Sequence, residues 1–509
     1  MLRDRDLISI QEARQRLESA RRAATALVEF TQEQVDRICA NMVTEAVRHA
    51  EEFARIAVEE TGFGRVESKT EKNLFASRDL WAYMRELKTV GVVRADERQR
   101  VYDIAEPYGV IAAICPVTNP TSTAIFKILC ALKTRNAVVL SPHPRAARCV
   151  GAVAEKLGKV ARDSGAPAGS VGVLETVTLE GTSELMRHEE TDLILATGGS
   201  GLVRAAYSAG KPAYGVGPGN VPAFIEKSAD PARAVRCIIE SQLFDYGTLC
   251  SSEQSIVCEK ANVDAVLSEL RAQKAAVLSP EDCAKLERVA LKNDIMNPDV
   301  VGLPATRITA MAGIDVPSDT TLLVAPCDSV GPQTPLSREI LAPIVSFFVA
   351  KDWREGCELC LKILHLGGLG HTLVIHSNDE DIIWEFALKK PAMRILVNAP
   401  SSQGGVGYAT NLVPSMTLGC GSFGGNITAD NIGPLNLINL KRLAFVQPEF
   451  ERKLGREGRP TVVRPDAEAG RPAASSGTSS GAILPRFDGG QALPIFKRGH
   501  FEIPKRRDV

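Results

Sequence analysis

Few aromatic residues and no excess of charge of either sign are the first features of this sequence. Phe, Trp and Tyr make up 5% of the 509 residues, and 60 Lys and Arg stand against 61 Asp and Glu, a formal net charge of −1. Such a balance gives no electrostatic reason to expect a nucleic acid or an anionic membrane as partner. The length, with an ordinary 44% of hydrophobic residues, predicts two or three globular domains.

Long apolar runs are also missing. No run approaches the roughly 18 residues that span a membrane, and the charged start Met1–Asp6 lacks the apolar region of a signal peptide. We therefore expect a cytoplasmic protein. The twelve cysteines show no framework spacing, which suits a reducing compartment. One close pair, Cys357 and Cys360, falls in a helical pattern and is interpreted as helix packing, so no metal site is expected.

What the sequence does contain is a long alternation of helical and strand patterns. Two helices are predicted within residues 9–60, the second entered through Thr31 as N-cap with Gln34 three residues later. Another is predicted over about 69–87. Beyond it, strands are predicted at 101–107, 109–114, 137–140, 171–174 and 193–196, and helices at about 120–133, 146–164 and 181–188. This order is typical of a parallel α/β sheet, whose ligands lie at the carboxyl ends of the strands.

A glycine-rich turn follows the last of these strands and precedes a predicted helix at 202–209. It contains Thr197, Gly198, Gly199 and Ser200. Glycines let the backbone approach a diphosphate, and a helix N-terminus supplies N–H groups. The turn departs from the G-x-G-x-x-G pattern, and glycine turns are often only structural, but its context favours nucleotide binding. A second glycine-rich loop, 214–222, is either a structural turn or a backbone surface for a ligand.

Cys250 is the residue around which the remaining motifs are organised. A lone cysteine is more often a small buried hydrophobe than a nucleophile. Cys250 follows a predicted helix at 231–245 and the flexible Gly247, and polar residues come after it. A thiol on such a turn can be held near backbone N–H groups that favour the thiolate. The residues alone leave nucleophile and core about equally open.

Two further polar residues stand in loops before predicted strands. Glu339 precedes a strand at 344–349 and, taken alone, would be a surface acid. His371 follows three glycines, and a catalytic and a structural role remain equally open. The glycine-dense residues 402–426 suit loops around a cleft. From 455 to 481 the chain has little to bury and is predicted to be a disordered linker.

Taken in order, these motifs resemble the CoA-acylating aldehyde dehydrogenases, especially the aldehyde half of the bifunctional aldehyde–alcohol dehydrogenases. The similarity runs from about Thr31 to Leu443. The segments that carry it are 118–127, 141–145, 196–199, 217–220, 244–245, 250–254, 370–372 and 418–426. Because the sequence ends at Val509, no alcohol-dehydrogenase half is expected.

The resemblance implies an α/β fold of the aldehyde dehydrogenase type. A Rossmann-like cofactor domain would cover residues 1–219, with a hairpin at 98–108 belonging to a small oligomerisation element. The catalytic α/β domain would cover 220–418. Residues 419–450 would return to the cofactor domain and supply an oligomerisation strand. A linker and tail would occupy 451–509.

The resemblance also assigns roles to individual residues. Cys250 would attack the aldehyde to form a thiohemiacetal and then a thioester, with the Asn119 amide stabilising the oxyanion and His371 acting as acid/base for CoA. A nicotinamide cofactor would accept the hydride, NAD being favoured and NADP possible. Its expected binding residues are Pro116, Ser141, His143, Thr197, Gly198, Gly199, Ser200, Gly217 and Glu339.

One absence favours the acylating reaction within this resemblance. Family members that release a free acid carry a Glu-Leu-Gly-Gly segment whose Glu activates water, and the matching residues here are Val216–Gly219. A hydrolytic aldehyde dehydrogenase with another base, a γ-glutamyl-phosphate reductase-like enzyme and a non-enzymatic scaffold are the alternatives. The expected substrate is a short aldehyde, with sulfoacetaldehyde an open alternative.

The expected partners are the aldehyde, CoA and further copies of the chain. We expect a homodimer or homotetramer. A short tail behind a linker, as in some similar enzymes of bacterial microcompartments, would allow binding to a shell. Prolines and glycines in this tail oppose a continuous helix, so an extended tail over a neighbouring subunit and a tail without a role remain open.

Overall fold

The computed structural model describes residues 4–292 and 295–454, which divide into two compact units. Among these residues, the first unit contains those up to Val93 together with those from Ile104 to Lys441, and the second contains Arg94–Asp103 and residues 442–454. The predicted linker and tail at 451–509 therefore lie almost entirely outside the described residues. The fold described below is α/β, as the sequence predicts.

The N-terminal region has three helices, where the sequence predicted two. They are α1 (Arg5–Leu27), α2 (Gln32–Arg48) and α3 (Ala50–Thr61). The predicted capping box of α2, Thr31 with Gln34, is confirmed. His49 leaves the helical conformation, with φ −103° and ψ 11°. The apolar stripe continues across this break, which is why the pattern reads as one helix.

The predicted helix at 69–87 is also interrupted. It consists of α4 (Val66–Leu74), a π-helical turn (Phe75–Asp79) and α5 (Leu80–Met84). The Ser77 hydroxyl of this turn donates to the Asn73 carbonyl of α4. One extra residue in a helical turn does not disturb the hydrophobic pattern enough to be seen in the sequence.

A five-stranded parallel sheet occupies the N-terminal half of the chain. Its order is β5-β4-β3-β6-β7, with central register pairs Ala112–Val139 and Ala112–Ile194. The strands are β3 (Val110–Ile114), β4 (Ala137–Ser141), β5 (Val171–Val173), β6 (Leu193–Thr197) and β7 (Ala213–Val216). The sequence interpretation missed β7, because four residues that include Gly215 look like a loop.

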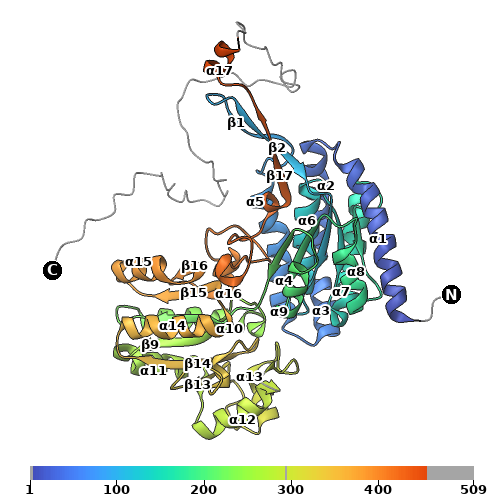
Figure 1. Ribbon diagram of the computed structural model, residues 1–509. Coiled ribbons are helices and arrows are strands. Elements are labelled where there is room, and N and C mark those ends of the chain that lie inside the picture. Colours follow the sequence, from blue (N-terminus) through green and yellow to red (C-terminus); the bar gives the residue numbers. More distant parts are fainter. Residues whose placement is uncertain (1–3, 293–294, 455–509) are drawn as a thin grey trace. The chain divides into compact units, whose positions relative to one another are not determined.

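Helices cover both faces of this sheet (Figure 1). They are α6 (Pro120–Lys133), α7 (Ala147–Asp163), α8 (Leu179–Arg187) and α9 (Ser200–Tyr207). Right-handed crossovers place α6 and α7 on one face and α8 and α9 on the other. The N-terminal helices complete both layers, since α1 packs on α8 while α2 and α3 pack on α7.

The second large sheet has seven parallel strands in the order β10-β13-β14-β9-β8-β15-β16. They are β8 (Val221–Ile225), β9 (Glu253–Glu259), β10 (Ala275–Val277), β13 (Leu322–Pro326), β14 (Ile344–Ala350), β15 (Gly370–His376) and β16 (Ala392–Val397). Its helices are α10 (Pro231–Leu243), α11 (Val263–Ala272), α12 (Pro280–Ala290), α13 (Ala305–Ala312), α14 (Trp353–Gly367), α15 (Glu380–Lys389) and α16 (Ser401–Val406).

Both faces of the seven-stranded sheet are buried. Ala223 and Ile225 of β8 belong to the core cluster under α10 and α11, whereas Phe224 points to the other face and stacks on Phe386 of α15, with ring centroids 4.9 Å apart. This alternation follows from the two-residue period of a strand. The strands are therefore apolar on both sides.

The connection between β7 and β8 joins the two sheets. Residues 217–220 leave the carboxyl end of β7 and enter the amino end of β8, so these two sheet edges meet there. The predicted boundary at 219/220 falls in this connection. Both sheets belong to the same compact unit, and the predicted division into cofactor and catalytic domains stays a prediction.

A small sheet contains the predicted hairpin. Its order is β1-β2-β17, with β1 (Gly91–Asp96), β2 (Val101–Pro107) and β17 (Ile438–Ala444). Two short strands, β11 (Leu291–Lys292) and β12 (Ile295–Met296), and a last helix, α17 (Pro448–Lys453), complete the described elements. Being last in the order, β17 pairs on one side only.

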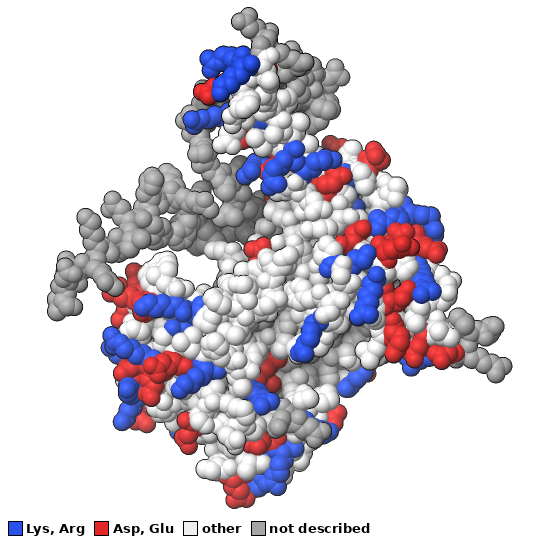
Figure 2. All heavy atoms as spheres, in the orientation of Figure 1, with Lys and Arg blue, Asp and Glu red and all other residues white. Residues whose placement is uncertain are grey.

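On the face shown in Figure 2, acidic and basic side chains are interspersed. None of the helices in the described part of the chain combines the length and apolar character needed to cross a bilayer. Within residues 4–292 and 295–454, no three His, Cys, Asp or Glu side chains gather as metal ligands would. All twelve cysteines are free thiols.

Candidate active site

Cys250 lies on a tight turn between α10 and β9. The predicted helix at 231–245 ends at Leu243, because Asp245, Tyr246 and Gly247 adopt positive φ angles of 55°, 53° and 69°. Such angles reverse the chain within a few residues and are uncommon outside glycine. The turn leaves Cys250 partly exposed while Thr248 and Leu249 are buried.

His371 is brought to Cys250 from a different strand. It is the second residue of β15 and is fully buried. Its Nε2 atom lies 3.2 Å from Cys250 Sγ, and its Nδ1 atom lies 3.0 Å from Thr372 Oγ1. Since β9 and β15 both flank β8, the thiol and the imidazole come from either side of this central strand.

The pair is neutral near pH 7. Burial, together with the positive charge of Arg394, lowers the pKa of His371 to about 3. Burial, reinforced by the Glu339 carboxylate, raises the pKa of Cys250 to about 12. The expectation that this turn favours the thiolate is therefore wrong for the enzyme without ligands, because loss of hydration outweighs the nearby backbone N–H group.

Glu339 is tied to the connection between the two sheets. Its Oε1 atom accepts a hydrogen bond from the Gly219 N–H at 2.8 Å, and burial raises the pKa of the carboxyl to about 8. Gly219 is itself tightly enclosed, because a Cβ added there would overlap the Cys250 carbonyl oxygen and lie 3.1 Å from His371 Cγ. Gly219 thus lies against both the Cys250 backbone and the His371 ring.

Asn119 approaches the same turn from the first sheet. It follows β3 and precedes α6, and its Nδ2 atom donates to the Thr248 carbonyl at 3.2 Å, two residues before Cys250. Its Oδ1 atom accepts from Lys72 Nζ at 2.6 Å. The amide therefore has its acceptor end on Lys72 and its donor end towards the cysteine turn.

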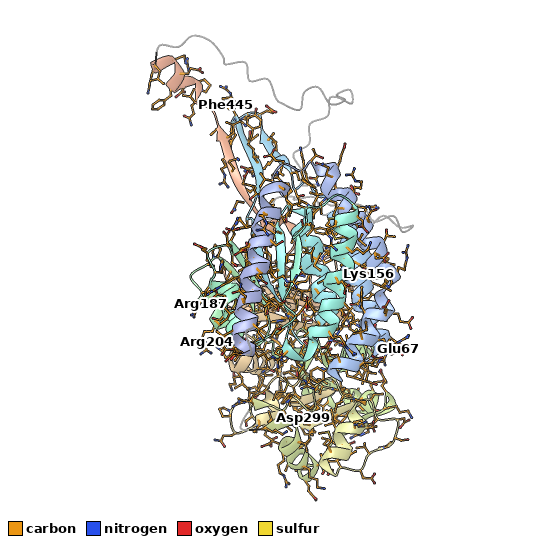
Figure 3. The ribbon with its side chains drawn as sticks, turned by 90° about the vertical axis from the view of Figure 1, so that its right-hand side faces the viewer. Glu67, Lys156, Arg187, Arg204, Asp299 and Phe445 are labelled. Atoms are coloured by element: carbon orange, nitrogen blue, oxygen red, sulfur yellow. The ribbon has the colours of Figure 1, made fainter. Side chains whose placement is uncertain are left out.

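The sequence interpretation missed a buried charge cluster under this turn. Asp245 Oδ2 accepts from Lys69 Nζ at 2.9 Å and from Lys72 Nζ at 2.6 Å, and all three side chains are at most 3% exposed. Burial lowers the pKa of Lys72 to about 8. By contrast, Glu67 of the same helix is at the surface (Figure 3). The buried face of α4 carries polar residues. In the sequence, a helix with such residues looks like an ordinary exposed helix, so it gives no signal of a buried site.

Arg394 on β16 was also missed. It is buried, and its Nη2 atom donates to the Gly419 carbonyl at 2.7 Å while its Nε atom lies 3.4 Å from Thr372 Oγ1. Its charge acts on Cys250, on His371 and on the buried Cys420, and it opposes protonation of the imidazole. A lone arginine in a strand pattern carries no sequence signal for such a position.

Eight of the nine residues expected to bind the cofactor lie at one edge of the five-stranded sheet, and the ninth, Glu339, precedes β14 of the other sheet. The eight lie at the carboxyl ends of four strands: Pro116 after β3, Ser141 and His143 at the end of β4, Thr197, Gly198, Gly199 and Ser200 at the end of β6, and Gly217 after β7. The order reverses between β3 and β6, the place where such sheets bind dinucleotides. An added Cβ at Gly199 or Gly201 would meet no atom, so the start of α9 presents open backbone that fits a diphosphate.

Three features define the class of protein. They are a partly exposed thiol in contact with a buried imidazole, an amide next to them, and a sheet edge of the dinucleotide-binding type. The chain belongs to the aldehyde dehydrogenase family, whose family model matches residues 6–285. The resemblance and the fold inferred from the sequence are confirmed.

Three relatives define the branch. The chain is 41% identical over 441 residues, 86% of its length, to the bifunctional aldehyde-alcohol dehydrogenase AdhE of Escherichia coli, of which it covers 50%. It is 33% identical to the succinate-semialdehyde dehydrogenase (acetylating) of Clostridium kluyveri, covering 87% of this chain and 97% of that relative. An acetylating aldehyde dehydrogenase of Geobacillus thermoglucosidasius superposes with a TM-score of 0.87 at 48% identity, covering 90% of this chain and all of that one. The chain thus spans about half the length of the bifunctional relative.

Proposed function

We propose that this chain catalyses the reversible, NAD(P)-dependent, CoA-acylating oxidation of a short aldehyde. The observation that carries the proposal is the 3.2 Å contact between Cys250 Sγ and His371 Nε2, made by a nucleophile and a neutral base. The acetylating activity named for the Geobacillus and Clostridium relatives supports the same reaction.

Cys250 performs the covalent step. Its sulfur bonds to the aldehyde carbon while His371 Nε2 accepts the thiol proton, and the carbonyl electron pair moves to oxygen. The Asn119 Nδ2 and the Cys250 backbone N–H then stabilise the oxyanion, which offsets the charge of the imidazolium. The bound nicotinamide cofactor supplies the hydride acceptor, and a thioester on Cys250 remains. Glu339 and the 197–200 turn hold this cofactor.

His371 serves the second half-reaction. It first loses to solvent the proton taken from Cys250, and it then accepts the proton of the CoA thiol, whose sulfur bonds to the acyl carbon as the bond to Cys250 Sγ breaks. The thiolate of Cys250 then recovers a proton from the imidazolium. Because His371 holds protons weakly when buried, it returns them readily in either direction of the reaction.

The hydrolytic alternative rests on one specific observation. Val216–Gly219 carry no carboxylate, but the Glu339 carboxyl acts on Cys250 and has a pKa raised by burial to about 8. Such a group could act as a base for water. Its Oε1 atom is already engaged by Gly219 N–H, which favours the acylating reaction.

The charges around Cys250 favour an uncharged aldehyde. The Lys72 ammonium directs its three N–H groups to Asn119, Asp245 and Thr248, and Arg394 donates to protein oxygens from Nε and both Nη atoms. Lys72 therefore has no free donor for a sulfonate or carboxylate, and each nitrogen of Arg394 already donates to the protein. Acetaldehyde and propionaldehyde therefore fit better than sulfoacetaldehyde or the semialdehyde named for the Clostridium relative.

Three finer proposals rest on sequence resemblance alone. They are NAD rather than NADP as the natural cofactor, a homodimer or homotetramer, and a cytoplasmic location with a possible place inside a bacterial microcompartment through the tail.

Product analysis with and without CoA tests the function. With acetaldehyde and NAD, the purified protein should form NADH and acetyl-CoA only when CoA is present. Acetate formed at the same rate without CoA would overturn the acylating proposal in favour of hydrolysis. Sulfoacetaldehyde assayed alongside should react at least about tenfold more slowly in kcat/KM, the equivalent of one unmade charge interaction of about 1.4 kcal/mol.

The role of His371 is tested by His371→Ala, with Cys250→Ala as the inactive reference. The variant should slow steady-state acetyl-CoA formation more than the first burst of NADH, because CoA attack needs the base a second time. Equal losses in both phases would mean that His371 positions Cys250 or the cofactor instead.

A further inference from the structure

The Lys72 ammonium is enclosed by three acceptors beneath the cysteine turn. Its Nζ atom lies 2.6 Å from Asn119 Oδ1, 2.6 Å from Asp245 Oδ2 and 3.0 Å from Thr248 Oγ1. Lys72 is 3% exposed, so water does not compete for these contacts. An ammonium has three N–H donors and no acceptor, and each donor is used.

Donor-only character fixes which end of the Asn119 amide faces the cysteine. A carboxamide has an acceptor oxygen and a donor NH₂ of nearly equal size, so an amide between two neutral partners can rotate by 180°. The ammonium can bond only to Oδ1. Nδ2 is then directed to the other side, where it donates to the Thr248 carbonyl at 3.2 Å and lies 3.2 Å from Thr118 Oγ1.

We propose that Lys72 is the positioning residue of the oxyanion site, holding the Asn119 amide so that Nδ2 rather than Oδ1 faces the aldehyde oxygen. This inference rests on the proposed function, which gives Asn119 its role. With Oδ1 turned towards the substrate, an acceptor would oppose the developing negative charge instead of stabilising it. When the aldehyde binds, its oxygen replaces either the Thr248 carbonyl or Thr118 Oγ1 as a hydrogen-bond partner of Nδ2.

The rest of the cluster keeps this ammonium charged and in place. Asp245 accepts from both lysines through Oδ2 and from the Arg65 N–H at 2.8 Å through Oδ1. Two ammonium groups on one carboxylate leave one positive charge in a buried site beside Cys250. This charge also favours the oxyanion and the thiolate over their neutral forms.

Lys69 provides a matched control within the same cluster. Its Nζ atom donates to Asp245 Oδ2 at 2.9 Å and to the Thr118 carbonyl at 2.8 Å, and these bonds do not reach the Asn119 side chain. Replacing either lysine by Met leaves Asp245 paired with the other. The two variants therefore remove equal charge from the same ion cluster, and only one releases the amide.

The test is a double-mutant cycle on the full-length protein, read as the rate of the NADH burst with acetaldehyde. Removal of an oxyanion donor costs about 100- to 1,000-fold in kcat, so Asn119→Ala should fall in that range and Lys72→Met should lose about 30-fold or more. Lys69→Met should stay within about 5-fold of wild type. In the Asn119→Ala background, Lys72→Met should add less than about 3-fold, since residues acting through one another are non-additive.

The outcomes separate the inference from the function on which it rests. No acetyl-CoA from wild type, or full activity of Asn119→Ala, would overturn the proposed function or the role of Asn119. Activity lost by Asn119→Ala but kept by Lys72→Met, equal losses for the two lysine variants, or additive losses in the cycle would overturn the positioning role. If Lys72→Met does not fold, Lys72→Gln and Lys69→Gln make the same comparison. The glutamine of Lys72→Gln retains an N–H donor for Oδ1, but its amide can also rotate. A smaller loss of burst rate in Lys72→Gln than in Lys69→Gln would therefore contradict the inference.

Discussion

At the scale of single residues, the proposed chemistry starts from a thiol and an imidazole that are both uncharged before substrate arrives. The pKa of Cys250, about 12, and that of His371, about 3, are moved apart by burial. A thiolate–imidazolium pair in the resting enzyme is therefore unfavourable. Proton transfer from Cys250 to His371 becomes favourable only when new charge appears beside the pair. Because the resting thiol stays protonated, it is protected from non-specific alkylation or oxidation.

The pH dependence of Cys250 alkylation should report on Glu339. The Glu339 carboxyl, with its pKa raised to about 8, is largely uncharged below that pH and ionised above it, and its charge raises the pKa of Cys250. We expect Glu339→Gln to react with iodoacetamide at the wild-type rate near pH 6.5. Near pH 9.5 it should react about 3- to 10-fold faster, since one pKa unit is a factor of ten in thiolate.

The measurement is mass spectrometry of the Cys250 peptide without cofactor, and Glu180→Gln on the surface of α8 is the control. Rates that coincide over the whole pH range would show that Glu339 does not act on the thiol.

The residues that sequence could predict are those with an unusual local context. Cys250 after Gly247 and His371 after three glycines stood out, and the family resemblance joined them to Asn119. Lys69, Lys72 and Arg394 did not, because nothing local distinguishes a buried lysine on a polar helix from an exposed one. Asp245 in the cysteine turn is 173 residues away from Lys72 in the sequence. Only the contact between α4 and this turn makes Lys72 a site residue.

At the scale of elements, the amino ends of β9, β8 and β15 act together. Cys250 precedes β9, Gly219 precedes β8 and His371 is the second residue of β15, and these strands are neighbours in the sheet. The middle position must carry no side chain for the outer two to meet. Gly219 is therefore required by its enclosure and not by its backbone angles.

Gly219→Ala should separate the thiol from the imidazole. The added methyl would overlap the Cys250 carbonyl and press on His371, and a displacement of about 1 Å can cost about 100-fold in rate. We expect a fall of that order in kcat with little change in far-ultraviolet circular dichroism. Gly151→Ala, where a Cβ meets no atom within 4 Å, is the matched control. Retained turnover by Gly219→Ala would mean that the contact between Cys250 and His371 is dispensable.

Most elements were predictable because their hydrophobic period is regular. β3, α6 and α7 follow from continuous or 3.6-residue patterns. Three features could not be predicted: β7, the break at His49 and the π-helical turn. Each depends on contacts with residues that lie outside the local sequence pattern. For β7 these neighbours are the β6 residues to which its four residues pair.

At the scale of the whole molecule, the edge strand β17 is a candidate for assembly. β17 is the last strand of its sheet, and Leu440 and Leu443 on it are 41% and 42% exposed. An edge strand with exposed apolar side chains is a template for pairing with a second copy. The predicted oligomer is thus consistent with the availability of this edge.

We expect Leu440→Lys with Leu443→Lys to weaken self-association, because charges on an edge strand oppose pairing. Sedimentation at micromolar concentration should give a dimer or tetramer for the wild type and smaller species for the variant. Leu179→Lys, an 85% exposed leucine at the start of α8, is the control. A monomeric wild type, or an unchanged variant, would contradict assembly through β17.

Truncation after Leu454 should leave the chemistry intact. Every residue of the proposed site lies between Lys72 and Cys420, so kcat and KM for acetaldehyde and CoA should remain within about twofold, the range of surface changes away from a site. Loss of the oligomer would indicate that the tail joins subunits, and loss of shell association alone would indicate targeting. A truncated protein that assembles but does not turn over would contradict a tail outside the chemistry.

The placement of thiol, glycine and imidazole at the ends of three adjacent strands has a consequence for heat inactivation. Their spacing is set by the hydrogen-bonded ladders of a sheet buried on both faces, where backbone amides exchange with solvent slowly. No lid or local hinge has to open for the pair to separate. The sheet itself has to melt, so activity and structure should be lost at the same temperature.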